Sequence, residues 1–474
     1  MTRMIVVDIG KTLSKVSLWT SAGELLDRQT RPNAPIEVGG LRRLDVAGVE
    51  AWLVEALSRY AGEDVTHIVP VGHGAGVAAI EGGRLAFAPL DYEQPIPPDV
   101  EARYARERDP FEMTGSPRLP DGLNMGAQLF WLDEIEAEVM AGAVLLPWAQ
   151  YWAWFLSGVA ASEVTSLGCH SDLWCPHSDN FSFFADRRGW SARFAPRACA
   201  DAVVGHLRSD LARSTGLPGS ARILAGLHDS NAALLAARGF AEIAGREATI
   251  LSTGTWFVAM RLPGAGAPMP ALSEGRDCLI NVDAYAAPVP SARFMGGREI
   301  ESVIEIDTRR VDIKPDQPRL LAAVPDLLAR GAMLLPTLAP GCGPFPEHAG
   351  GWIDEPSDWY ERRAAMCLYA ALVADASLDL IGASGQLLVE GRFAEAEVFV
   401  RALAALRPGT AIYTANAHND VSFGALRLVD SGLVPASTLE TVAPLPGDLA
   451  AYRSAWRAEI DRAATHKAAE SVRA

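Results

Sequence analysis

Cysteine is scarce in this chain. Its 474 residues include 6 cysteines, and no two of them form a C-x-x-C pair. A disulfide framework needs a denser set, so the sequence favours scattered, buried thiols. The densest group is Cys169, His170, Cys175 and His177. Because its spacing fits no usual zinc pattern, we expect no metal site there.

Positive charge is also in short supply. Lys and Arg number 42 against 58 Asp and Glu, which gives a formal net charge of −16. Such an acidic protein has no general attraction for nucleic acid or for an anionic membrane surface, so we expect neither as a partner. A small phosphate compound can still bind locally, through backbone amides, a helix N-terminus or a metal ion.

Long uninterrupted apolar runs are missing as well. The run Met4–Val7 stops at Asp8, which is too early for a signal peptide. The stretch Val139–Ser162 carries no charge and is long enough to span a bilayer. It is interrupted by Pro147, Gln150, Ser157 and Gly158. We therefore expect a buried helix over Trp148–Leu156 and a cytoplasmic protein.

Strand and helix patterns alternate along the chain, as in α/β proteins. Two expected strands, Met4–Asp8 and Lys15–Trp19, flank a turn at residues 10–12. The second half of the sequence repeats this strand–turn–strand motif, with Ala248–Leu251 and Trp256–Leu262 around a polar turn. The length allows two or three domains. We therefore predict two related α/β domains with a cleft between them and a boundary near Ala241–Glu247.

The first turn has the composition of a phosphate loop. Asp8 ends a strand and is followed by Gly10, Lys11 and Thr12. A carboxylate there can bind Mg²⁺, while a glycine turn wraps a phosphate with its amides. A Walker A loop is rejected because Ile5 stands where its first glycine is needed and a strand pattern follows. An ordinary β-hairpin is the alternative.

A second candidate site lies at His228 and Asp229. The apolar run Ile223–Ala225 predicts a strand, and Ala232–Ala237 predicts a helix. Asp229 then stands between a strand end and a helix start. It is either a helix N-cap or a general base that accepts a proton from a sugar hydroxyl.

Further glycine-rich segments are candidate ligand loops. Ser252–Thr255 could bind a second phosphate or form a plain hairpin turn. Gly296 and Gly297 precede an expected helix, so their backbone can lie flat against a nucleotide, or form an ordinary loop. Gly72–Gly76 follows a strand, but Val77 occupies the third glycine position of a dinucleotide fingerprint, which argues against NAD.

Taken together, these motifs resemble the FGGY carbohydrate kinases of the actin/hexokinase/Hsp70-like superfamily. The segments that carry the resemblance are Met4–Thr12, Leu119–Asn124, Pro147–Gly158, Leu227–Asp229, Leu251–Trp256 and Leu335–Gly351. The His-Asp pair and the Ser-Thr-Gly-Thr-Trp run are most similar to the rhamnulokinase and fuculokinase branch.

The resemblance implies two ribonuclease H-like (actin-like ATPase) domains flanking a central cleft. Residues 1–244 would form the sugar-binding domain with the catalytic aspartate, and residues 245–474 the nucleotide-binding domain. The activity implied is ATP-dependent phosphorylation of a primary hydroxyl of a small sugar, such as the ketoses L-rhamnulose or L-fuculose. ATP and Mg²⁺ would be the cofactors, and a homodimer is compatible with the resemblance.

The resemblance also assigns roles to residues. Asp229 would be the catalytic base, and Asp8 and Asp229 would bind Mg²⁺. The sugar would contact His228, His73, Gly74 and Asp91. ATP would be bound by Gly10, Lys11, Thr12, Thr253, Gly254, Thr255, Gly296, Gly297, Gly391 and Arg392. We expect the Lys11 cation to lie beside the phosphates.

The chain departs from the family pattern at Val389–Phe393, where a run of glycines is usual. We expect Arg392 and Phe393 to stack on the adenine base instead. Two alternatives stay open. One is a kinase for a polyol or another ketose, and the other is a non-catalytic actin-like nucleotide-binding protein.

Overall fold

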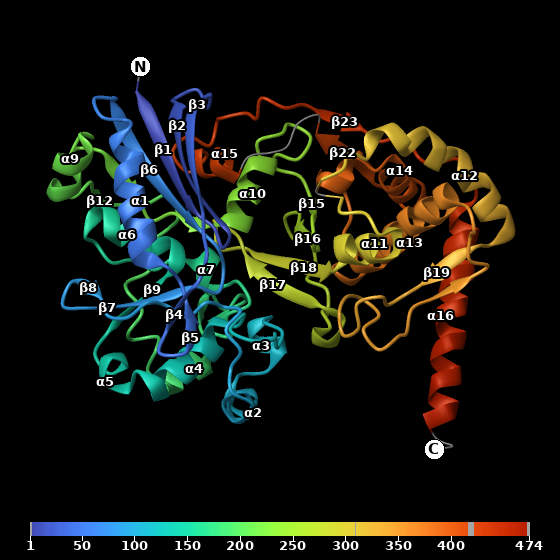
Figure 1. Ribbon diagram of the computed structural model, residues 1–474, viewed down its shortest axis with the longest axis horizontal. Helices are drawn as coiled ribbons and strands as arrows, with labels where there is room; N and C mark the ends of the chain where they lie inside the picture. Colours follow the sequence, from blue (N-terminus) through green and yellow to red (C-terminus); the bar gives the residue numbers. More distant parts are fainter. Residues whose placement is uncertain (1, 309, 416–420, 472–474) are drawn as a thin grey trace. The chain divides into compact units, whose positions relative to one another are not determined.

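The computed structural model describes residues 2–308, 310–415 and 421–471. Their contacts divide the chain into two compact units (Figure 1). The first comprises Met1–Phe240, Ile280–Val289 and Asn419–Ala436, and the second Ala241–Leu279, Pro290–His418 and Ser437–Ala474. The change near residue 240 falls beside the expected boundary. The first unit also takes in two segments from the second half of the sequence.

The first unit is an α/β layer structure. Its strands are β1 (Arg3–Ile9), β2 (Leu13–Thr20), β3 (Leu25–Pro32), β4 (Ile36–Val38), β5 (Leu41–Arg43), β6 (Val65–Gly72), β7 (Val77–Glu81), β8 (Arg84–Leu85), β9 (Val144–Pro147), β10 (Trp174–Cys175), β11 (Asn180–Phe181), β12 (Val203–His206), β13 (Arg222–Leu224) and β14 (Leu227–His228). Its helices are α1 (Val46–Ser58), α2 (Pro98–Glu107), α3 (Phe111–Thr114), α4 (Met125–Ile135), α5 (Ala137–Met140), α6 (Trp148–Ser157), α7 (Val164–Leu167), α8 (Phe183–Arg187), α9 (Ser209–Thr215), α10 (Asp229–Ala237) and α15 (Val421–Leu426). The main sheet has the order β12-β13-β6-β1-β2-β3, and β14 also pairs with β6.

Strand β1 is buried on both faces, and its side chains alternate between two cores. Ile5, Val7 and Ile9 pack with residues of α1 and α6. Met4 and Val6 pack with residues of α10 and α15 on the opposite face (Figure 1). Since successive side chains of a strand point to opposite faces, Asp8 projects on the side of Met4 and Val6. This places its carboxylate on the sheet face that α10 covers.

The carboxyl ends of three neighbouring strands lie in register. Strand β1 runs parallel to β6, with Ile9 opposite Gly72. Strand β14 also runs parallel to β6, with His228 opposite the same Gly72. Parallel neighbours are about 4.8 Å apart, so Ile9 and His228 lie about two strand spacings from each other. The ends of parallel strands are where α/β proteins place their ligands.

The expected buried helix over Trp148–Leu156 is confirmed as α6. Ala149, Tyr151 and Trp152 are fully buried in the first unit. Gly72 and Gly76 pack against this helix, because Cβ atoms on them would lie 2.8 Å from the main-chain N of Ala149 and 2.7 Å from Cβ of Trp148. Within the described part of the chain, no helix is long and apolar enough to cross a membrane.

The second unit repeats the strand pairing of the first. Its strands are β15 (Ala248–Thr253), β16 (Phe257–Leu262), β17 (Cys278–Val282), β18 (Pro288–Phe294), β19 (Met333–Leu335), β20 (Gly351–Ile353), β21 (Gln386–Gly391), β22 (Ala411–Ala415) and β23 (Leu439–Thr441), and the facing ends of β17 and β18 belong to the segment Ile280–Val289 of the first unit. The sheet order is β17-β18-β16-β15-β21-β22-β23. The run β18-β16-β15-β21 matches β3-β2-β1-β6, with two antiparallel pairs followed by a parallel one in each. The expected repetition of an α/β unit is therefore confirmed.

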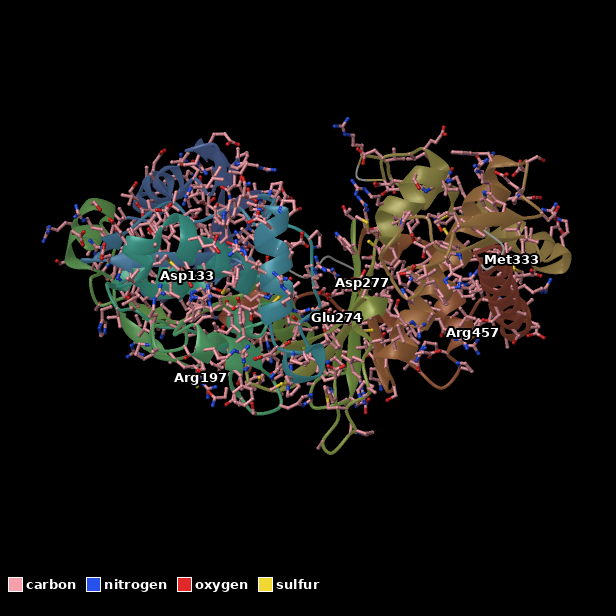
Figure 2. The ribbon with its side chains drawn as sticks, turned by 90° about the horizontal axis from the view of Figure 1, so that it is seen from below. Asp133, Arg197, Glu274, Asp277, Met333 and Arg457 are labelled. Atoms are coloured by element: carbon pink, nitrogen blue, oxygen red, sulfur yellow. The ribbon has the colours of Figure 1, made fainter. Side chains whose placement is uncertain are left out.

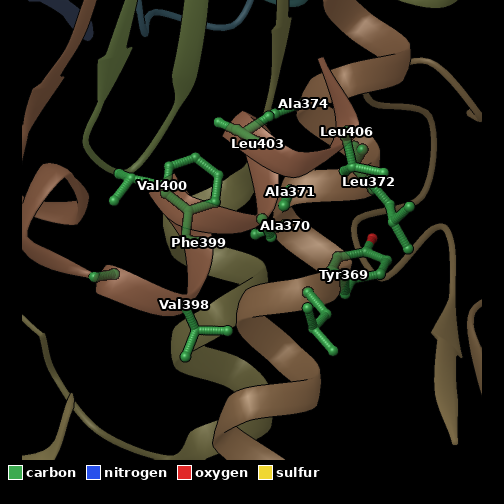
Figure 3. Packing of buried hydrophobic residues seen from close by; sticks show 14 of the residues in the cluster. Tyr369, Ala370, Ala371, Leu372, Ala374, Val398, Phe399, Val400, Leu403 and Leu406 are labelled. Atoms are coloured by element: carbon green, nitrogen blue, oxygen red, sulfur yellow. The ribbon is translucent and has the colours of Figure 1, made fainter. Parts of the chain in front are cut away.

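Helices surround this second sheet. They are α11 (Gly296–Ile304), α12 (Gln317–Arg330), α13 (Trp359–Leu380), α14 (Glu397–Leu406) and α16 (Leu449–Ser471), with the 3₁₀ turns η1 (Glu274–Arg276), η2 (Lys314–Asp316) and η3 (Arg392–Glu395). Helix α13 is buried over most of its length and forms the centre of the core with α14 (Figure 3). Tyr369 and Leu372 of α13 and Phe399 and Leu403 of α14 belong to this cluster. The strand ends that carry the candidate nucleotide residues are fixed on this core.

Candidate active site

A buried ion pair holds Asp8 at the end of β1. Lys15 is its cross-strand partner in β2, and Lys15 Nζ lies 2.9 Å from Asp8 Oδ2. The Asp8 side chain is 5 % exposed. A buried carboxylate needs such a partner to remain charged. Lys15 was not predicted as a site residue, although the Asp8–Lys15 register follows from a hairpin centred on residues 11 and 12.

Asp229 is the first residue of α10, but it is not the N-cap. The capping position is His228, whose side chain makes no capping hydrogen bond. The Asp229 side chain is 34 % exposed. Burial raises its pKa, while hydrogen bonds from Ser230 and the charge of Lys15 oppose that rise. The capping alternative therefore does not hold, and Asp229 keeps an accessible carboxylate at a helix N-terminus, which favours its charged form.

His228 is buried directly behind this carboxylate. Its Nε2 lies 3.1 Å from Oδ1 of Asp229 and 3.9 Å from Sγ of Cys169. Its main-chain N–H donates to Oγ1 of Thr165, at 2.9 Å. Burial lowers the pKa of His228 to about 4, so the imidazole is neutral at neutral pH. Neither Cys169 nor Thr165 was predicted, since both lie about sixty residues away in the sequence.

His73 and Gly74 complete this side of the site. Nδ1 of His73 is 2.7 Å from the carbonyl oxygen of Gly74, and the imidazole packs edge-on against Tyr92 at 5.4 Å. Burial lowers the pKa of His73 to about 4. A Cβ atom on Gly74 would lie 2.8 Å from Nε2 of His228. The structure thus brings His73, Gly74, His228 and Asp229 together, and glycine is required where the loop meets His228.

Lys11 pairs with Asp91 rather than standing free. The ammonium contacts Oδ1 of Asp91 and lies 3.6 Å from Glu93 Oε2. It also lies over the Tyr92 ring, 4.7 Å from its centroid. Asp91 is fully buried. The neighbouring carboxylates thus compensate the charge of Lys11 and join it to a candidate sugar residue, while its expected place beside the phosphates stays a prediction.

A small cavity of about 20 Å³ adjoins this pair. Its lining includes Gly10, Lys11, Asn33, His73, Asp91 and Trp148. A space of this size accommodates about one water molecule. Gly10 itself turns tightly, since its N–H donates to the carbonyl of Leu13. Thr12 is exposed at the tip of the turn.

In the second unit, three candidate nucleotide segments meet. A Cβ atom on Gly297 would lie 2.0 Å from the carbonyl oxygen of Gly254. One on Gly391 would lie 2.2 Å from the carbonyl oxygen of Thr253. Gly391 also has φ +86°, a conformation that favours glycine. These glycines are therefore required by packing of the protein on itself, and Gly296 and Gly297 lie inside the first turn of α11 rather than before it.

The two threonines of this turn have different surroundings. Oγ1 of Thr253 donates to the carbonyl of Glu390 and accepts from the N–H of Phe393, at 3.2 Å. Its side chain is thereby used to join β15 to β21 and η3. Thr255 is exposed, so its hydroxyl, unlike that of Thr253, can reach a ligand.

The prediction that Phe393 stacks on an adenine base is wrong. Phe393 is buried in the core, with its ring 5.2 Å from that of Phe257. The Arg392 guanidinium also lies over this ring, 4.9 Å from its centroid, and pairs with Glu301 at 3.1 Å. The sequence alone did not show that the residue after Arg392 turns inward to pack on β16.

A further ion pair fixes the strand next to the turn. Asp277 (labelled in Figure 2) accepts from Nε of Arg293 at 2.9 Å and from the N–H of Gly343 at 2.8 Å. The Arg293 guanidinium lies 4.8 Å from the centre of the Trp256 ring. Trp256 follows the candidate phosphate turn directly, so this network holds one end of the turn in place.

Comparison with known proteins decides the family. The family described as carbohydrate kinase FGGY, C-terminal domain, matches residues 245–437. A carbohydrate kinase from Novosphingobium aromaticivorans is 64 % identical, with a TM-score of 0.93 over 97 % of this chain and 98 % of that one. The chain belongs to the FGGY carbohydrate kinases. Members of this family are phosphotransferases with an alcohol group as acceptor, and the expected resemblance is confirmed at family level.

More distant FGGY kinases share the fold. A ligand-bound xylulose kinase from Lactobacillus acidophilus has a TM-score of 0.77 at 13 % identity, covering 99 % of both chains. A Plasmodium falciparum glycerol kinase with ADP has a TM-score of 0.77 at 11 % identity, covering 98 % of both. No curated protein matches the chain. At these identities the two structures establish the actin-like ATPase fold and leave the acceptor sugar of this FGGY kinase unassigned.

Proposed function

We propose that this carbohydrate kinase transfers the γ-phosphate of ATP to a primary hydroxyl of a small ketose, with L-rhamnulose and L-fuculose as the first candidates. The observation that carries the proposal is the accessible carboxylate of Asp229. It stands at a helix N-terminus beside the carboxyl ends of β1, β6 and β14. The choice of a ketose rests on the His228-Asp229 pair and the Ser252–Trp256 run, through their resemblance to the rhamnulokinase and fuculokinase branch.

Asp229 acts as the general base. It accepts the proton of the sugar hydroxyl while the sugar oxygen forms a bond to the γ-phosphorus. The bond between that phosphorus and the bridging oxygen breaks, and ADP leaves with the oxygen. The raised pKa of Asp229 suits this role, because a base becomes more effective as its pKa approaches the working pH. Positioning and electrostatics supply most of the acceleration in such reactions.

On the sugar side, His73 and Gly74 are the proposed contacts, and the fully buried Asp91 acts on the sugar through Lys11, with which it is paired. His73 is neutral and therefore offers a hydrogen-bonding nitrogen without a charge. Asp91 carries its charge within the pair that it forms with Lys11. Hydroxyl groups are well matched by such a mixture of neutral and ionised partners.

ATP is bound by small residues that let the backbone approach the phosphates. Gly254 is suited to this, because a Cβ atom there would meet no atom closer than 3.7 Å. Lys11 and Thr12 supply main-chain amides in the first turn, and Gly10 shapes that turn through its own N–H, which is bonded to the carbonyl of Leu13. Gly297 and Gly391 pack directly against the turn at Thr253–Thr255 and hold its shape, with Arg392 beside Gly297 and with Gly296 against Phe257 and Phe294. Thr255 contributes the hydroxyl group of its exposed side chain.

Mg²⁺ fits the donor set at Asp8, with Asp229 on the same face of the sheet. Among the described residues, no group of three or more acidic, His or Cys side chains could hold a metal ion alone. That is the usual situation for Mg²⁺, which takes one or two carboxylates together with substrate phosphates and water. When bound, the ion would neutralise negative charge on the terminal phosphates.

The test is a coupled assay of ADP release with a panel of ketoses, aldoses, alditols and gluconate. Sugar-dependent release with a ketose supports the proposal. Preference for a polyol or an acid would change the substrate class, and hydrolysis that no sugar stimulates would overturn it. Asp229→Asn should reduce kcat by about 10²–10⁴-fold while ATP still binds. Asp201→Asn, at an exposed residue, is the matched control and should keep full activity.

A further inference from the structure

We propose that His228 is a positioning residue for Asp229, and that Thr165 and Glu163 hold His228 in place from behind. This inference deepens the proposed function and rests on it. It replaces the expectation that His228 contacts the sugar. Three consecutive contacts carry it, all within the first unit: Glu163 to Thr165, Thr165 to His228, and His228 to Asp229.

The surroundings of His228 leave little room for a sugar. Its side chain is 7 % exposed, and Nδ1 is buried with no hydrogen-bond partner in the described part of the chain. The Gly74 loop closes against Nε2, where even a Cβ atom would approach to 2.8 Å. Nε2 is the ring nitrogen that faces the proposed catalytic base, Asp229.

The position of the ring proton follows from its neighbours. Nε2 lies within hydrogen-bond distance of a carboxylate oxygen, 3.1 Å from Asp229 Oδ1, and has the Cys169 sulfur on another side. Both atoms can accept a hydrogen bond. A neutral imidazole with its proton on Nε2 donates to them, whereas the other tautomer would set two lone pairs against each other. The ring therefore presents an N–H to Oδ1 of Asp229.

Thr165 and Glu163 anchor the chain at His228. Oγ1 of Thr165 accepts from the N–H of His228 and donates its own proton to Oε2 of Glu163. Both residues are fully buried. The hydroxyl proton is thereby committed to Glu163, which leaves a lone pair of Oγ1 for the main chain of His228. This fixes the step from β14 into α10 at the point where the Asp229 carboxylate emerges.

The contact with His228 gives the two carboxylate oxygens of Asp229 different roles. With Oδ1 engaged by Nε2–H, Oδ2 of Asp229 is the oxygen that accepts the proton from the sugar hydroxyl. A displacement of about 1 Å in such a group can cost about a hundredfold in rate. His228 then acts on kcat through Asp229, whereas a sugar ligand would act mainly on KM.

The first experiment compares two substitutions of His228 in the full-length enzyme. His228→Gln places an amide N–H near the position of Nε2 and should retain most of kcat. His228→Leu lacks a donor and should lower kcat by roughly 10–100-fold with little change in the KM for the sugar. In an Asp229→Asn background, His228→Leu should cause no further loss, because the group it positions has been removed.

Three outcomes would overturn the role of His228. These are a raised sugar KM with unchanged kcat in His228→Leu, equal losses in the Gln and Leu variants, and additive losses with Asp229→Asn. They differ from failure of the proposed function, which would show as wild-type enzyme without sugar-dependent ADP release or as Asp229→Asn with normal turnover.

Thr165 gives an independent test if His228→Leu fails to fold. Thr165→Val is nearly isosteric but cannot accept from His228, and should lower kcat by about tenfold. Thr165→Ser keeps the hydroxyl and should restore it. Thr215→Val on α9 is the control, because this buried hydroxyl bonds to the main chain near its own helix end. Normal kcat in Thr165→Val would overturn the anchoring role.

Discussion

Lys15 Nζ lies 2.9 Å from Asp8 Oδ2, and the two residues face each other across the first hairpin. The pair explains how a nearly buried carboxylate remains charged at the end of a strand. It also makes Lys15 part of the site, since its charge acts on Asp229 as well.

Lys15→Met should therefore destabilise the protein by roughly 1–3 kcal/mol, the usual cost of removing one hydrogen-bonding partner of a buried group. The same substitution should cost less in an Asp8→Asn background, where no carboxylate charge remains. Urea unfolding of the four proteins forms a double-mutant cycle. Strictly additive losses would show that the pair has no coupling energy.

Gly74→Ala should lower kcat without unfolding the protein. The new methyl group would meet Nε2 of His228 at 2.8 Å, so the ring must move away from Asp229. We expect a loss of about tenfold or more in kcat, since small misplacements of catalytic groups are expensive. Gly142→Ala is the control, because its Cβ atom would meet nothing closer than 3.6 Å. Wild-type turnover in Gly74→Ala would contradict the tight packing of this loop.

Substitutions of Thr253 and Thr255 should have different effects, one on protein stability and the other on ATP binding, although both residues lie in the same turn. Thr253→Val removes a hydroxyl that bonds both Glu390 and Phe393, and should cost about 1–3 kcal/mol of stability. Thr255→Val changes an exposed side chain and should alter stability by less than about 0.5 kcal/mol. It should instead raise the KM for ATP. Thermal unfolding and ATP titration of both variants would distinguish these effects, and a reversed pattern would refute the assignment.

Glu163 should make stability depend on pH. Burial raises the pKa of its carboxyl to about 7, so the folded protein holds this proton at pH values where the unfolded chain has lost it. The resulting stability is present below about pH 4.5 and is lost as the pH rises through about 7.

Glu163→Gln does not titrate and keeps an oxygen that can accept from Thr165. Its stability relative to wild type should therefore increase by about 2–3 kcal/mol between about pH 5 and about pH 8. Urea unfolding of both proteins at the two pH values measures this difference. A constant difference would mean that the Glu163 carboxyl is already ionised in the folded state at about pH 5.

Much of the local structure could be predicted because it depends on short-range patterns. The alternation in Met4–Asp8 and Lys15–Trp19 gave the first hairpin, and the run into His228 and Asp229 gave a strand followed by a helix. These patterns record which face of each element is buried. They do not record which distant element covers it.

The error in the sequence-based prediction arose at that second level. Phe393 was expected to contact a base, yet it packs against Phe257 in the core. Its side-chain type allowed either role, and burial by a remote segment decided between them. In the same way, no local pattern indicated that Lys11 pairs with Asp91, eighty residues away along the chain.

The sequence by itself determined the two α/β units, the turns that begin them and the carboxylates placed at their strand ends, because hydrophobic periodicity and turn chemistry are local. Only the tertiary structure decided that His228 faces Asp229 from a buried position and that Thr165 and Glu163 support His228. It also decided that residue 297 must be glycine, because the main chain of Gly254 packs against it. Those relationships depend on distances between segments far apart in the chain, which are set by the packing of helices on the sheets.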